Sequence, residues 1–89
     1  MTTKVASPMQ HRTIDAINAE VMRARMKFPS NAKMLAALVE EVGELAKALL
    51  QRMPTDEVRK EAIQVACVAV RIIEEGDSDF TYGEWGDAP

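Results

Sequence analysis

The sequence predicts an all-α protein that consists of a helical hairpin and one N-terminal helix. Apolar residues make up 47% of the 89 residues, but only 4% are aromatic, so Ala, Val, Leu, Ile and Met must form the core. This composition favours helices over a β-sandwich. Apolar residues recur at helical spacing in three segments, and the breaks "FPSN" and "MPTDE" separate them. A chain of this length is expected to form one domain.

The first predicted helix runs from about Pro8 to Lys27. Ser7 can cap its start, and proline is tolerated at the first helical position. The helix should end near Phe28, because Pro29 disfavours helical backbone angles in the residue before it. Its apolar face consists of Ile14, Ile17, Val21, Ala24 and Phe28.

The second predicted helix runs to about Arg52, with Ser30 or Asn31 as its N-terminal cap. A proline-containing break ends it, and the short connection to the next helix predicts an antiparallel hairpin. Its apolar face consists of Met34, Leu35, Leu38, Val42, Leu45, Leu49 and Met53.

The third predicted helix begins at a cap formed by Thr55 or Asp56 and ends at Gly76, a typical residue after a helix C-terminus. Residues 1–76 therefore form a single all-α domain, and 77–89 are expected to form an irregular tail. The third helix is apolar around most of its circumference, more than a small monomer can cover. We therefore expect a homo-oligomer, a dimer or a tetramer, with a core of the four-helix-bundle type.

Charge and cysteine content exclude several classes of partner. The net charge of −3 provides no general attraction to nucleic acid or to an anionic membrane. Cys67 is the only cysteine, so no intrachain disulfide can form, and a reducing cytoplasm is the expected location. The longest nearly apolar run, 62–73, is too short and too polar to span a bilayer.

Several glutamates interrupt the apolar faces of the hairpin. On the second helix, Glu41 and Glu44 fall beside the apolar stripe, and on the third helix Glu61 falls within an apolar face. A buried, ionised carboxylate needs a proton, a cationic partner or a metal. Glu41 and Glu44 can also be read as an ordinary charged helix edge, Glu40 as a solvated residue, and Glu61 as the partner of a basic residue on the first helix. Clustered carboxylates without His or Cys suit Mg²⁺ or Mn²⁺.

At these glutamates the chain resembles the MazG-like, all-α nucleoside triphosphate pyrophosphohydrolases. The family signature is EExxE on one helix and ExxD on the next. The first half is complete here as "EEVGE", Glu40 to Glu44, whereas the second half is "EAIQ", with Gln64 in place of the aspartate. The resemblance covers about Arg25 to Glu75.

The resemblance implies an Mg²⁺-dependent reaction in which water attacks the α-phosphate and releases pyrophosphate and a nucleoside monophosphate. Glu41, Glu44 and Glu61 are implied as metal ligands, with Gln64 contributing an amide oxygen or holding a water or phosphate. Glu40 is implied either as a further ligand or as the group that orients the attacking water. The loss of the aspartate leaves open a second interpretation, a non-catalytic helical module for self-association or nucleotide sensing.

Basic and aromatic residues provide candidates for substrate binding. Lys27 and Lys33 flank the first break and can contact phosphate oxygens, and Asn31 can read a base edge. A solvated helix end and a capping role explain these same residues as well. In the tail, aromatic residues can stack on a base or cover apolar surface; they are Phe80, Tyr82 and Trp85.

Overall fold

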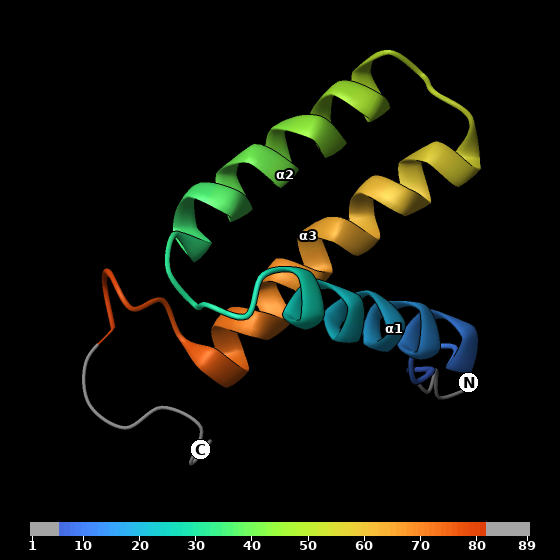
Figure 1. The fold of residues 1–89 in the computed structure, drawn as a ribbon. Helices are drawn as coiled ribbons and strands as arrows, with labels where there is room; N and C mark the ends of the chain where they lie inside the picture. Colours follow the sequence, from blue (N-terminus) through green and yellow to red (C-terminus); the bar gives the residue numbers. More distant parts are fainter. Residues whose placement is uncertain (1–5, 82–89) are drawn as a thin grey trace.

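The computed structural model describes residues 6–81, and these residues form three helices joined by short connections (Figure 1). The helices are α1 (His11–Lys27), α2 (Met34–Leu50) and α3 (Thr55–Glu75). The described part of the chain contains no β-strand. The predicted all-α class is therefore confirmed, and so is the order of the helices.

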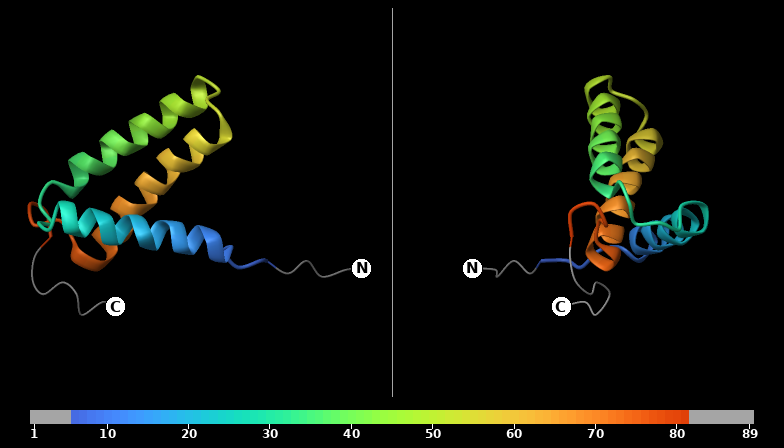
Figure 2. Two further views of the ribbon diagram at one scale, coloured as in Figure 1. Left: turned by 45° about the vertical axis from the view of Figure 1, so that its right-hand side comes forward. Right: turned by 60° about the vertical axis from the view of Figure 1, so that its left-hand side comes forward.

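The helix α3 is the centre of the fold. It forms an antiparallel hairpin with α2, and α1 crosses it on another side (Figures 1 and 2). The helices α1 and α2 do not pack against each other. Their relative position therefore depends on what each of them contacts on α3 and at its two ends.

The helix boundaries agree with the sequence prediction at α3 and differ at α1. Gly76 follows α3 with φ 68° and ψ −164°, a conformation that essentially only glycine adopts. The helix α1 begins at His11 rather than near Pro8, and the Gln10 carbonyl accepts the first hydrogen bonds. The prediction of a start at Pro8 was wrong, because Ser7 does not cap this helix.

The N-terminus of α2 is capped from the far end of the chain. An Asp77 carboxylate oxygen accepts the backbone N–H of Leu35 at 2.7 Å, and Asp79 accepts that of Lys33 at 3.3 Å. The prediction that Ser30 or Asn31 caps this helix was wrong. The Ser30 hydroxyl accepts the Ala32 N–H instead, and Asn31 donates to the Glu75 carbonyl. Residues 77–81 thus form a turn that stabilises the start of α2.

The end of α2 is closed by a Schellman motif. The Met53 N–H donates to the Ala48 carbonyl and the Arg52 N–H to the Leu49 carbonyl, at 3.0 and 3.1 Å. Arg52 has φ 52° and occupies the left-handed position where glycine is usual. This motif turns the chain directly into α3.

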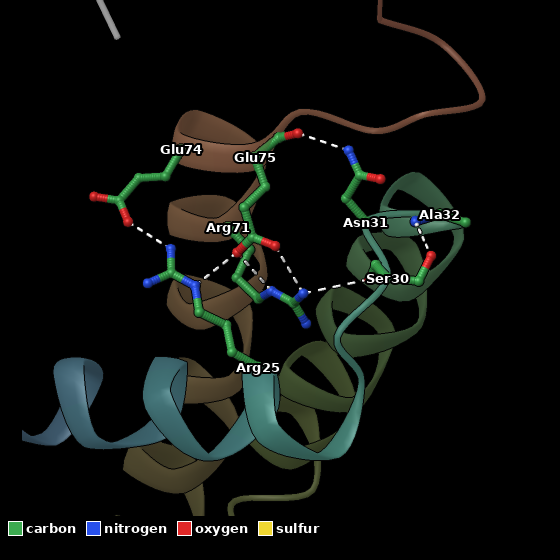
Figure 3. Close-up of polar contacts among 7 residues, drawn as sticks. All are labelled: Arg25, Ser30, Asn31, Ala32, Arg71, Glu74 and Glu75. Carbon is green, nitrogen blue, oxygen red and sulfur yellow. Dashed lines mark hydrogen bonds and ion pairs between the residues drawn. The ribbon is translucent and has the colours of Figure 1, made fainter. Parts of the chain in front are cut away.

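An ion-pair cluster joins the C-terminal end of α3 to α1 and to the following loop (Figure 3). Arg71, only 4% exposed, donates to both carboxylate oxygens of Glu75 at 2.8 and 2.9 Å and to the Ser30 carbonyl at 3.3 Å. Arg25 of α1 contacts Glu75 at 2.8 Å and Glu74 at 2.6 Å. The hydrogen bonds from Arg71, and then those from Arg25, hold the pKa of the Glu75 carboxyl below its usual value despite burial.

Few side chains are fully buried, and many large apolar side chains are exposed. The buried apolar residues among those described are Val21, Met34, Ala48 and Cys67. The apolar residues of α3 are largely half-buried, so this helix is better covered than the sequence indicated. Within residues 6–81, exposed large apolar side chains occur on all three helices, and those of α2 share one face that consists of Leu35, Val39, Val42, Leu49 and Leu50.

Removing the Asp77 carboxylate should destabilise the fold. Asp77→Ala leaves the Leu35 N–H without its cap, and the loss of an N-terminal cap costs about 1–2 kcal/mol. Urea unfolding followed by circular dichroism measures the change in the free energy of unfolding. Ser78→Ala, in the same exposed turn, is the control and should change it by less than about 0.5 kcal/mol. Equal stabilities of the two variants would contradict the capping role.

Candidate functional site

The glutamates of "EEVGE" and of α3 approach one another across the hairpin. Glu44 and Glu61 line one hollow of about 220 Å³ close to the turn between α2 and α3, together with Lys47 and Glu57. Glu41, one turn before Glu44, is half-buried and lies close enough to Glu61 for their charges to interact. The hairpin therefore brings together three carboxylates that the sequence separates into two motifs.

These carboxylates lack cationic partners in the described part of the chain. Among residues 6–81, the side chains of Glu40, Glu41, Glu44 and Glu61 make no hydrogen bond or ion pair. Among the described glutamates outside the motif, Glu20 pairs with Arg23, Glu74 with Arg25 and Glu75 with two arginines, whereas Glu57 makes no ion pair. The expectation that Glu61 pairs with a basic residue of α1 is not met.

Burial and mutual repulsion act on Glu41. Desolvation raises the pKa of this carboxyl above its ordinary value, and the negative charges of Glu61, Glu40, Glu44 and Glu20 raise it further. A cation among these groups would reverse the second effect, since opposite charge favours the ionised form. Negative charge therefore predominates around Glu41, although Lys47 lines the neighbouring hollow with Glu44 and Glu61.

The donor chemistry suits a hard divalent cation, but the side chains are not gathered around one point. Carboxylate oxygens are the ligands that Mg²⁺ prefers. Within residues 6–81, no three His, Cys, Asp or Glu side chains are arranged so that together they could hold a metal ion. Glu41, Glu44 and Glu61 would therefore have to change rotamers to share one ion.

Gln64 is bonded to α1. Its amide nitrogen donates to a Glu20 carboxylate oxygen at 2.8 Å, and Arg23 holds the same carboxylate through two hydrogen bonds of 2.6 and 3.1 Å. Glu20 is 7% exposed, and the hydrogen bond from Arg23 keeps its pKa below the usual value, against the effect of burial. The ionised Glu20 can only accept hydrogen bonds, so the Gln64 amide must present its N–H to it.

The predicted substrate-binding residues occupy three different settings. Lys27 lines a hollow with Glu20 and Gln64, and its ammonium group lies 5.4 Å from the centre of the Phe28 ring. Asn31 uses its amide nitrogen on the Glu75 carbonyl at 2.7 Å. Lys33 adopts a left-handed conformation directly before α2, with φ 61°. Only Lys27 therefore faces a hollow that also contains a residue of the motif.

Glu40 and Phe80, two further candidates, are exposed to solvent. Glu40 is exposed on α2. Phe80 is 61% exposed in the turn after α3. Tyr82 and Trp85 fall outside the residues that the structure describes.

Sequence reasoning missed Glu20, which links α1 to the motif on α3. The signal was present, because Glu20 falls between Ile17, Val21 and Ala24 on the predicted apolar face of the first helix. The same argument identified Glu61. The basic residues around Glu20 gave no such signal, because their positions depend on how α1 crosses α3.

Comparisons with known proteins provide no relative for this chain. A scan against protein-family models found no match, and searches among curated proteins and solved structures also found none. The helices in the described part of the chain are either too short or too polar to cross a bilayer.

Neutralising Glu41 should stabilise the metal-free protein at neutral pH. A carboxyl whose pKa is raised on folding stabilises the folded state below its ordinary pKa of about 4.5, and this contribution is lost as the pH rises through the raised value. Glu41→Gln replaces the carboxyl by a neutral amide, so no negative charge forms at this position as the pH rises. Its free energy of unfolding should exceed that of the wild type at pH 7, and the difference should shrink toward pH 4.

Urea unfolding in EDTA at several pH values measures this difference. Glu40→Gln, at an exposed position on the same helix, is the control and should have the smaller effect. A Glu41→Gln variant less stable than the wild type at pH 7 would show that the ionised Glu41 carboxylate does not destabilise the folded protein.

Proposed function

We propose that this chain is an Mg²⁺-dependent nucleoside triphosphate pyrophosphohydrolase of the MazG-like kind, which converts a nucleoside triphosphate and water into a nucleoside monophosphate and pyrophosphate. The observation that carries the proposal is the contrast between two sets of glutamates. Those of the motif make no ion pair in the described chain, and the same holds for Glu57, whereas Glu20, Glu74 and Glu75 are each paired with arginine. Glu41 and Glu61 are partly buried as well as unpaired, which costs stability that a bound cation would restore, whereas Glu40 and Glu44 are exposed.

The proposal assigns a role to each residue of the motif. Glu41, Glu44 and Glu61 would hold the metal, and the oxygen of Gln64 is available to it because the amide nitrogen faces Glu20. Bound Mg²⁺ would neutralise the charge that develops on the phosphates. Glu40, exposed beside these ligands, would orient the attacking water or accept its proton.

A non-catalytic helical module is the second candidate. Two observations favour it: Gln64 replaces an acidic residue of the motif, and the carboxylates of residues 6–81 are not gathered around one point. Such a module would use the same hairpin for self-association or nucleotide sensing. It would bind a nucleotide without releasing pyrophosphate.

We also propose that the protein acts as a homo-oligomer in the cytoplasm. The exposed apolar face of α2 supports association, since Val39 is 64% exposed and Leu50 is 84% exposed. A second copy that covers this face with its own α2 would complete a core of the four-helix-bundle type. The single cysteine fits a reducing compartment.

Pyrophosphate release from a panel of NTPs and dNTPs tests the reaction, and Glu61→Gln tests the site. The variant should lose Mg²⁺ binding in isothermal titration and lower pyrophosphate release at least about 100-fold, because it removes a charged ligand from the ion. Its helical content should be retained.

Glu57→Gln is the matched control, because Glu57 lines the same hollow on the same helix but is not part of the motif. It should keep most of the Mg²⁺ affinity. Unchanged Mg²⁺ binding by Glu61→Gln would refute the proposed ligand set. Nucleotide binding by the wild type without any pyrophosphate release would favour the non-catalytic module.

Light scattering at micromolar concentration should give a multiple of the 9.8 kDa chain mass. Val39→Glu places a charge in the middle of the exposed α2 face and should shift the protein toward the monomer. Asp15→Asn, on the exposed side of α1, should leave the mass unchanged. A wild-type mass near 9.8 kDa would contradict the oligomer.

A further inference from the structure

A second hollow lies on the side of α3 that faces α1, next to the pair formed by Glu20 and Gln64. Its volume is about 380 Å³, and its walls include three basic residues: Arg23 and Lys27 from α1, and Lys60 from α3. A neighbouring hollow of about 400 Å³ shares Arg23 and Lys60 and adds one basic residue, Arg59, and one acidic residue, Asp56. Two helices therefore direct cationic side chains toward one region.

This hollow carries positive charge although the chain as a whole is acidic. Its one carboxylate, Glu20, is already neutralised by two hydrogen bonds from Arg23. Lys27 and Lys60 make no ion pair within residues 6–81. The two ammonium groups thus remain uncompensated in a protein whose net charge is −3.

The contact with Glu20 favours a neutral side chain at position 64. Its amide donates to Glu20 at 2.8 Å, so an aspartate here would set two carboxylates against each other. It would also cancel one of the uncompensated positive charges in the hollow. Gln64, in place of the aspartate of the ExxD pattern, therefore keeps the positive charge of the hollow from being reduced.

We propose that this hollow binds the diphosphate end of a nucleotide, with Lys27, Lys60 and Arg23 as the groups that contact phosphate oxygens. Oxyanions with several charges match a set of ammonium and guanidinium donors. Gln64 follows Glu61 by one helical turn and lines the hollow, so a phosphate chain could extend from here toward the carboxylates. The proposal rests on the proposed function for the identity of the ligand, and its test does not require hydrolysis.

Isothermal titration of the full chain with inorganic pyrophosphate in EDTA tests the hollow without any metal. Lys60→Gln and Lys27→Gln should each weaken binding about tenfold, which corresponds to one charge-assisted contact. Arg52→Gln removes a positive charge from the turn between α2 and α3, outside the lining of the hollow, and should leave the affinity unchanged. Circular dichroism checks that each variant remains folded.

Two further binding measurements test the choice of ligand and the role of Gln64. A nucleoside monophosphate should bind more weakly than pyrophosphate, because it offers fewer charged oxygens. Gln64→Asp should weaken pyrophosphate binding, whereas the neutral Gln64→Asn should weaken it less. No measurable pyrophosphate binding by the wild type, or equal affinities for the wild type and both lysine variants, would overturn the proposal.

The outcome is separable from that of the proposed function. Weaker pyrophosphate binding by Lys60→Gln, in a protein that hydrolyses no nucleotide, would support the hollow and refute the enzyme. Nucleotide hydrolysis by the wild type, with pyrophosphate affinity independent of both lysines, would support the enzyme and refute the hollow.

Discussion

The ion-pair cluster of Arg25, Arg71 and Glu75 holds α1 and the loop that follows it against the C-terminal end of α3. Because α1 and α2 do not pack against each other, their arrangement depends on contacts with α3 and its ends. Arg71 bonds Glu75 and the Ser30 carbonyl, while Arg25 reaches Glu75 from α1. Removing one partner from such a buried pair leaves an uncompensated charge and costs several kcal/mol, about 3–5. The cluster therefore fixes the crossing of α1 over α3, on which the basic hollow between these two helices depends.

The charges of the protein are distributed unevenly along α3. At its C-terminal end, arginines neutralise Glu74 and Glu75. Near its start, Glu61 lies close to Glu41 and Glu44 and makes no ion pair in the described chain, although Lys47 lines the hollow that Glu44 and Glu61 share. Between them, Gln64 contacts Glu20 at the edge of the basic hollow. Along its length, α3 thus carries the ion-pair cluster, the basic hollow and the carboxylates, and the proposed function assigns the latter two to a phosphate chain and its metal ion.

The sequence predicted the helices well because their signals are local. Helical spacing and the glycine at position 76 suffice to define three segments and the end of α3. The cap of α2 could not be predicted, since Asp77 lies 42 residues beyond Leu35 and reaches it only after α3 has formed. Likewise, Glu20 could be assigned to an apolar face but not to its contact with Gln64, 44 residues away. The family resemblance and the reaction remain predictions.

The central claim is that the glutamates of α2 and α3 form a negatively charged face whose carboxylates make no ion pair in the described chain. Bound Mg²⁺ would supply the positive charge that neutralises them. An NMR pH titration of the glutamate side-chain carboxyl carbons, with and without Mg²⁺, tests this claim directly. The account predicts that the pKa of Glu41 lies above its ordinary value in the metal-free protein and falls when Mg²⁺ is added. Glu75, already held by two arginines, should keep its low pKa in both conditions. A pKa of Glu41 that does not respond to Mg²⁺ would contradict the claim.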